Sequence, residues 1–103
     1  MKSRSHFGKL LAYFRHIRGQ TQIDIARSLN ERNFPISVSA IGKYEFGTRV
    51  PTPAFVYNVS RVLHLSEQEE KALLDACFAD MTQRFMNYYN LASTQEAMQD
   101  NEK

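Results

Sequence analysis

Apolar residues recur at intervals of three and four positions along most of this 103-residue chain, which is the spacing of one face of a helix. No segment shows the strict apolar–polar alternation of a β-strand, and no internal repeat is present. A chain of this length most often forms one domain. We therefore predict an all-α fold of five helices. The first is indicated by a row made of Phe7, Leu10, Leu11, Phe14 and Ile17, which Gly19 ends.

Capping residues and helix breakers delimit the second and third predicted helices. Thr21 can cap the second helix, with Asp24 as its partner in a capping box. Ser37 can cap the third helix, and Gly47 supplies the left-handed residue that ends it. The connection between the two helices, Asn30–Pro35, is polar and ends in Pro, so we expect extended chain just before that residue.

The last two helices follow a stiff loop at Thr48–Pro53. Pro53 suits the first turn of a fourth helix, where its missing N–H group costs little. Ser66–Glu69 forms another capping box, and no Gly or Pro follows it. We therefore predict that a long fifth helix runs to about Asn90 and is followed by a polar tail. The apolar face of the fourth helix would consist of Val56, Val59, Val62 and Leu63.

Charge is distributed unevenly between the two halves of the chain. Residues 1–49 contain nine Lys and Arg against three Asp and Glu, whereas residues 50–103 contain four against eight. A basic first half and an acidic second half indicate that a polyanion would bind the first half only. Chance clustering of solvated charges is the alternative explanation.

Several classes of protein do not fit the composition. The single cysteine, Cys77, cannot form an internal disulfide, which favours a reducing cytoplasm. No apolar run approaches the roughly 18 residues of a membrane span, and the basic N-terminal segment lacks the apolar core of a signal peptide. His6, His16 and His64 share no ligand spacing, so we predict no metal site. Without a carboxylate pair, a nucleophile triad or a glycine-rich phosphate loop, we predict no cofactor and no enzymatic activity.

The second and third predicted helices have the outline of a helix-turn-helix, whose second element lies in the major groove of DNA. Ile25, Ala26 and Leu29 would pack against Ile41 and Tyr44. The opposite face of the third helix then stays free to enter a groove about 12 Å wide. A helical bundle that shows this pattern by chance and binds no DNA is the alternative.

Three segments carry a closer likeness: RGQTQIDIARSL (Arg18–Leu29), ISVSAIGKYEFG (Ile36–Gly47) and RVPTP (Arg49–Pro53). In these segments the chain resembles the XRE-like helix-turn-helix family, which contains the lambdoid phage repressors and Cro proteins. The likeness covers roughly residues 7–65. It implies a lambda-repressor-like DNA-binding bundle at residues 1–65. The pattern of the residues that follow predicts an extended C-terminal helix at residues 66–91 and a polar tail at residues 92–103. The matching positions are Thr21, Gln22, Ala26, Ile41, Tyr44, Glu45 and Gly47.

The resemblance also implies which residues contact DNA. Val38 and Ser39, at the exposed start of the third helix, would touch base edges, and Lys43 lies one turn further along. Gln22 would bind phosphate and brace the third helix. The loop after this helix would follow the phosphate backbone. The complete set of expected DNA-binding residues is Gln22, Ser37, Val38, Ser39, Lys43, Thr48 and Arg49. Lys2 and Arg4 are further candidates for an arm that reaches phosphate.

Three features depart from the family pattern. The connection between the second and third helices is several residues longer, which would change the angle between them or add a contact through Arg32. Gly42 stands inside the third helix, where it either allows close approach to DNA or is simply tolerated. Val38 replaces what is often a polar side chain, and the base feature that it can contact is a thymine methyl group.

The predicted fifth helix carries an apolar seam with the alternating four- and three-residue spacing of a coiled coil. Its first part would pack on the body, whereas the later part has more apolar surface than a small body covers. We expect this seam to pair two copies of the chain; a helix that lies along its own domain is the alternative. The seam consists of Leu74, Phe78, Met81, Phe85 and Tyr88.

Together these features predict a sequence-specific DNA-binding transcriptional regulator, in the first instance a dimeric repressor of a pseudo-palindromic operator. Its partners would be double-stranded DNA and a second copy of the chain, without a membrane. The competing hypothesis is an antitoxin-like module that holds a partner protein through the fifth helix. A co-transcribed gene for a small toxic protein would favour that hypothesis. An activator that touches polymerase through the acidic half is a further alternative.

Overall fold

The computed structural model describes the backbone of residues 6–101 and the side chains of residues 6–95. Within this range the fold is all-α, as predicted, and contains no strand. The five helices are α1 (His6–Ile17), α2 (Gln22–Glu31), α3 (Val38–Phe46), α4 (Pro53–Val62) and α5 (Glu67–Asn101). None of the described helices is both long enough and apolar enough to cross a membrane.

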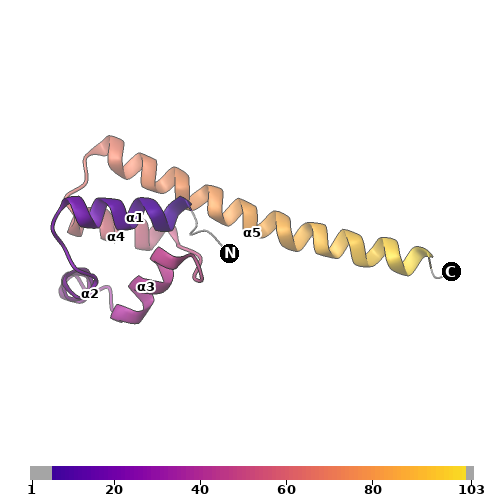
Figure 1. Ribbon diagram of the computed structural model, residues 1–103, viewed down its shortest axis with the longest axis horizontal. Coiled ribbons are helices and arrows are strands. Elements are labelled where there is room, and N and C mark those ends of the chain that lie inside the picture. The colour runs from indigo at the N-terminus through magenta and orange to yellow at the C-terminus, as the bar shows by residue number, and fades with distance from the viewer. Residues whose placement is uncertain (1–5, 102–103) are drawn as a thin grey trace.

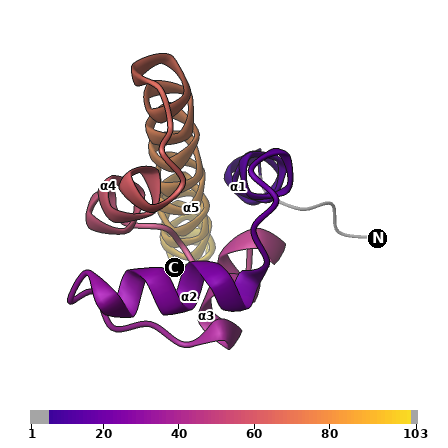
Figure 2. The same cartoon turned by 90° about the vertical axis from the view of Figure 1, so that its left-hand side faces the viewer.

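The helices form a small bundle from which the second half of α5 projects (Figure 1), giving overall dimensions of 59 × 29 × 27 Å. α1 packs against α3 on one side and against the start of α5 on the other. α4 packs against α5 and α2, and α2 crosses α3. Viewed along α5, α2 and α3 lie together on one side of the molecule, away from the first half of α5 (Figure 2).

The expected capping boxes are both present. The Asp24 backbone N–H donates to Thr21 Oγ1 at 3.0 Å, and the Thr21 backbone N–H donates to the Asp24 carboxylate at 2.9 Å. The bond from the Thr21 backbone N–H lowers the pKa of Asp24, because it favours the charged carboxylate. At the start of α5, Ser66 and Glu69 exchange the same pair of bonds. Glu69 also accepts a hydrogen bond from Arg18, so the second cap ties the end of α1 to α5.

The ends of α3 also follow the sequence prediction. Ser37 caps its start, since its hydroxyl accepts from the Ala40 backbone N–H at 3.1 Å. Gly47 ends it in the left-handed conformation, with φ of 91°.

Phe55 lies at the centre of the core. The apolar row predicted for the fourth helix did not include this residue. Its ring is fully buried and stacks on Tyr44 of α3, with ring centroids 4.0 Å apart. It also contacts Phe7 of α1 and Phe34 of the α2–α3 connection, each at 6.3 Å. Phe55 therefore joins α1, α3, α4 and the long connection, and Tyr44 packs on α4.

The long connection between α2 and α3 is fastened at both ends. Asn30 Nδ2 donates to the backbone oxygens of Ala26 and Ile36, at 2.7 and 2.8 Å. Arg32 donates to Asn58 of α4 at 3.3 Å, and its guanidinium lies over the Tyr57 ring. The Arg32 side chain thus packs on α4 and does not point toward the exposed face of α3.

α5 begins in the core and ends outside it. Leu73, Ala76 and Cys77 are buried against the body, so Cys77 is a core residue. Every side chain from residue 81 to residue 95 is exposed. The helix continues to Asn101. The predicted end near Asn90 is therefore too early. The segment 91–101 is polar, but it contains no Gly or Pro that would end a helix.

α1 approaches α3 closely at Gly8. A Cβ atom at this position would lie 2.1 Å from the Glu45 carbonyl oxygen, which is backbone and cannot rotate away. We expect Gly8→Ala to destabilise the protein by at least about 1–3 kcal/mol, because α1 and α3 would have to separate. The free energy of unfolding, measured by urea denaturation, tests this.

Gly42 provides a matched control for Gly8→Ala. A Cβ atom there would lie 3.7 Å from Gln22 Oε1, an ordinary contact, so this glycine is simply tolerated within α3. We expect Gly42→Ala to stabilise the protein by about 0.5–1 kcal/mol, because alanine has the higher helix propensity. Equal stability changes in the two alanine variants would contradict the close approach at Gly8.

Candidate nucleic-acid interface

α3 has one buried and one exposed face. Its buried residues are Ala40, Ile41, Tyr44 and Glu45, which pack toward α1, α2 and α4. Val38, Ser39 and Lys43 are exposed, as the helix-turn-helix pattern predicts. The exposed side of α3 is thus presented to solvent on the side of the molecule that α2 and α3 share (Figure 2).

The expected DNA-binding residues differ in how far the fold already uses their side chains. Ser39 and Lys43 are exposed on α3, whereas the Ser37 hydroxyl is held by the helix cap. Thr48 Oγ1 lies 3.5 Å from the Lys43 carbonyl oxygen. The Arg49 guanidinium lies over the Tyr44 ring, 5.2 Å from its centroid. The loop after α3 is consequently held against the helix end, and its two polar side chains remain exposed.

The backbone of this loop converges on a single acceptor. The N–H groups of Gly47, Thr48 and Arg49 all donate to the Lys43 carbonyl oxygen, at 2.9, 3.0 and 3.3 Å. These three hydrogen bonds hold the backbone of Arg49 close to the backbone of Lys43.

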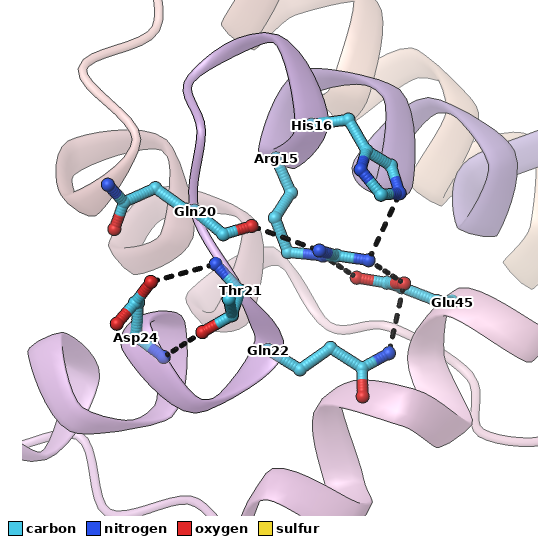
Figure 3. A network of polar contacts seen from close by, with 7 residues as sticks. All are labelled: Arg15, His16, Gln20, Thr21, Gln22, Asp24 and Glu45. Atoms are coloured by element: carbon cyan, nitrogen blue, oxygen red, sulfur yellow. Dashed lines mark hydrogen bonds and ion pairs between the residues drawn. The ribbon is translucent and has the colours of Figure 1, made fainter.

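Gln22 braces α3 through a buried carboxylate. It stands at the first position of α2, and its Nε2 donates to Glu45 Oε1 at 3.1 Å (Figure 3). The bracing contact that the resemblance implied for Gln22 is therefore present. Its side chain is half-buried at the junction of α2 and α3.

A buried ion pair between α1 and α3 stands behind this brace (Figure 3). Arg15 Nε and Nη2 donate to the two carboxylate oxygens of Glu45, at 2.6 and 2.9 Å. Arg15 Nη1 donates to the Gln20 carbonyl oxygen at 3.0 Å. The bonds to the Glu45 carboxylate raise the pKa of Arg15, because they favour the charged guanidinium. The Glu45 carboxylate thus connects α1 and α2 to α3, and Arg15 extends the network to the α1–α2 turn.

This pair is not among the DNA-binding residues predicted from the sequence. It was detectable, because Arg15 follows Phe14 and lies four residues after Leu11, on the apolar face of α1. Glu45 likewise lies four residues after the buried Ile41. Charged residues on the inner faces of two helices have to be paired when they are buried.

A second exposed feature lies on α5. Of the predicted seam, Leu74 is half-buried against the core, while Phe78 and Met81 are partly covered and Phe85 and Tyr88 are 66% and 67% exposed. These five residues share one side of the helix. The exposed part of the seam begins where α5 leaves the bundle, so the described bundle does not cover it (Figure 1). Lys2 and Arg4, the candidate arm, lie outside the described residues.

Comparison with known proteins gives one informative likeness. The chain is 35% identical over 63 residues to YazB of Bacillus subtilis strain 168, an uncharacterised HTH-type transcriptional regulator. The aligned region covers 61% of this chain and 84% of YazB. No family model matches the chain, and no solved structure matches it.

The Arg15–Glu45 pair can be tested by unfolding. Arg15→Met keeps the length of the side chain but leaves the Glu45 carboxylate buried without its cation. We expect a loss of about 3–5 kcal/mol in the free energy of unfolding. Arg15→Met/Glu45→Leu should be more stable than the single variant, because no uncompensated charge stays buried. A double variant that is as unstable as the single variant, in urea denaturation, would show that the pair matters only through its packing.

Proposed function

The chain belongs to the HTH-type transcriptional regulators, and from this premise we propose that it is a dimeric repressor of the XRE-like branch that binds a pseudo-palindromic operator. One observation carries the proposal. α3 is held by Glu45 to both α1 and α2, while its other face, with Ser39 and Lys43, is exposed. A rigid helix with a free polar face is what major-groove readout requires.

The chemistry of the exposed residues assigns their roles. Lys43 can donate to guanine O6 and N7, or to a phosphate. Ser39 is small and can either donate or accept. Val38 has no hydrogen-bonding group and is 38% exposed, so it would contact a thymine methyl group. Arg49 and Thr48 would follow the phosphate backbone from the anchored loop.

Gln22 would contribute in two ways. Its Nε2 is engaged by Glu45, so bracing of α3 is its structural part. Its place at the start of α2, with the Thr21 cap beside it, is suited to a phosphate at the edge of the same groove. The basic balance of residues 1–49 supports this half of the chain as the DNA-binding part.

Dimerisation would use the exposed part of the α5 seam. Residues 81–95 contain a single charged side chain, Arg84, among aromatic, aliphatic and uncharged polar residues. A nearly uncharged apolar seam can be self-complementary, which favours a second copy of the same chain. Two copies would present their recognition helices about 34 Å apart, one helical turn of DNA.

Repression would follow from occupancy of a promoter, which excludes polymerase. The proposal involves no catalytic step and places the protein in the cytoplasm, where the chromosome is accessible. Selection from a random double-stranded DNA pool at near-physiological salt tests it. Enrichment of an inverted repeat is the expected result, and the absence of any enriched sequence would overturn sequence-specific binding.

The exposed seam also supports a second candidate function, that of an antitoxin-like module that binds a partner protein through α5. The two candidates differ in the molecule that covers Phe85 and Tyr88, which is a second copy of the chain in the first and a different protein in the second. A monomeric chain whose seam is covered only by the product of a neighbouring gene would favour it over the homodimer.

Lys43 offers a direct test of DNA binding. Lys43→Ala should weaken binding to the selected operator by about 1–3 kcal/mol if Lys43 reads a base. Affinity should also fall steeply with salt concentration, because bound lysine and arginine side chains displace counterions from phosphate. Fluorescence anisotropy at several salt concentrations measures both effects.

Lys71→Ala is the matched control for Lys43→Ala. Lys71 is an exposed lysine on α5 that pairs with Asp75, far from α3 in the chain. Lys71→Ala should leave the affinity for the operator unchanged. Unaltered binding by Lys43→Ala, or binding that does not depend on salt, would remove Lys43 from the interface.

Phe85 tests the dimer. Phe85→Asp should shift a dimer toward monomer in sedimentation velocity at tens of micromolar protein, because it places a charge in the apolar seam. Gln83→Asp introduces the same charge on a different side of α5, where Gln83 bonds to Asn87. It should leave the dimer intact. A wild-type protein that sediments as a monomer would contradict the dimer.

A further inference from the structure

Phe46 is a large apolar side chain with no role in the core. It is the last residue of α3, and 62% of its surface is exposed. Within the described part of the chain its ring contacts no other aromatic ring or cation. Its neighbours Tyr44 and Glu45 are both buried, so the helix turns Phe46 away from the body.

The position of Phe46 on α3 joins it to the proposed reading face. Residues seven apart on an α-helix are almost aligned, and residues three apart share a face. Phe46 therefore stands in line with Ser39 and beside Lys43. The exposed face of α3 consequently has an apolar side chain at each end, Val38 and Phe46, with the polar readers between them.

We propose that Phe46 is a specificity-determining residue that contacts a pyrimidine 5-methyl group, that of thymine in ordinary DNA, in the major groove. This inference rests on the proposed DNA-binding function. The edges of the base pairs in the major groove carry hydrogen-bond donors and acceptors, and the thymine methyl is the apolar group among them. A phenyl ring on a groove-facing surface gains free energy by covering that methyl group and by losing its own exposure to water.

The length of α3 sets the spacing between the two apolar contacts. Val38 and Phe46 are eight residues apart, which corresponds to about 12 Å along a helix. DNA rises about 3.4 Å per base pair along each strand. An operator half-site read by both residues would therefore carry two methyl-bearing positions separated by about three to four base-pair steps.

Deoxyuridine substitution isolates the methyl group. Each thymine of the selected operator is replaced in turn by deoxyuridine, which removes the methyl group and keeps base pairing. For the wild-type protein, one such replacement at the Phe46 position should weaken binding by about four-fold, the equivalent of one buried methyl group. Phe46→Ala should bind the thymine and deoxyuridine operators equally at that position, and Phe46→Leu should retain part of the difference.

Two controls separate this effect from a general loss of binding. Tyr13→Ala removes another exposed aromatic ring, on α1, and should keep the full deoxyuridine penalty. In the Phe46→Ala variant, the loss of affinity caused by deoxyuridine at the position that Val38 contacts should be the same as in the wild-type protein. Circular dichroism and sedimentation of each variant confirm that helix content and oligomeric state are unchanged.

The outcomes distinguish this inference from the function on which it rests. If the wild-type protein enriches no DNA sequence, both are wrong. If it enriches an operator but Phe46→Ala keeps every deoxyuridine penalty, only the role of Phe46 is wrong. A Phe46→Ala protein that dissociates into monomers while each deoxyuridine penalty is unchanged would also overturn the role and assign Phe46 to the contact between copies.

Discussion

The ion pair between Arg15 and Glu45 is the interaction on which the arrangement of the helix-turn-helix depends. The Glu45 carboxylate accepts from Arg15 of α1 and from Gln22 of α2, while its own backbone belongs to α3. Its side chain is almost fully buried, so each of these bonds forms away from competing water. Directional bonds to two helices fix both the tilt and the rotation of α3. Hydrophobic contacts alone would allow α3 to slide, because they are not directional.

Three contacts hold α3, two from α1 and one from α4. Gly8 lets the backbone of α1 approach the carbonyl group of Glu45, the ion pair holds its side chain, and Phe55 of α4 stacks on Tyr44. All three lie at the C-terminal half of α3. The exposed residues at its start are therefore carried on a helix whose far end is fixed, which suits a surface that has to meet a rigid partner with its side chains already positioned.

α5 behaves differently in its two halves. The first half is amphipathic against the bundle and buries Leu73 and Cys77. Within the described residues the second half packs against no other helix, and its apolar seam is exposed; residues 81–95 contain a single charged side chain, Arg84. The bundle is too small to cover a helix of 35 residues. A free seam and a free face of α3 thus lie on two separate parts of the molecule, so a protein contact and a DNA contact can form together.

The sequence by itself determined the five helices and most of their boundaries, because caps such as Thr21–Asp24 and stops such as Gly47 act within a few residues. The end of α5, where no such stop stands, is the exception. It also determined which side of α3 faces solvent, since helical periodicity separates Ile41 from Lys43. Only the tertiary structure decided that Arg15 meets Glu45, that Phe55 is the centre of the core and that Arg32 binds α4. Those partners lie 26 to 30 residues apart in two of these cases. Pairing over such distances depends on how the helices pack, which no local pattern specifies.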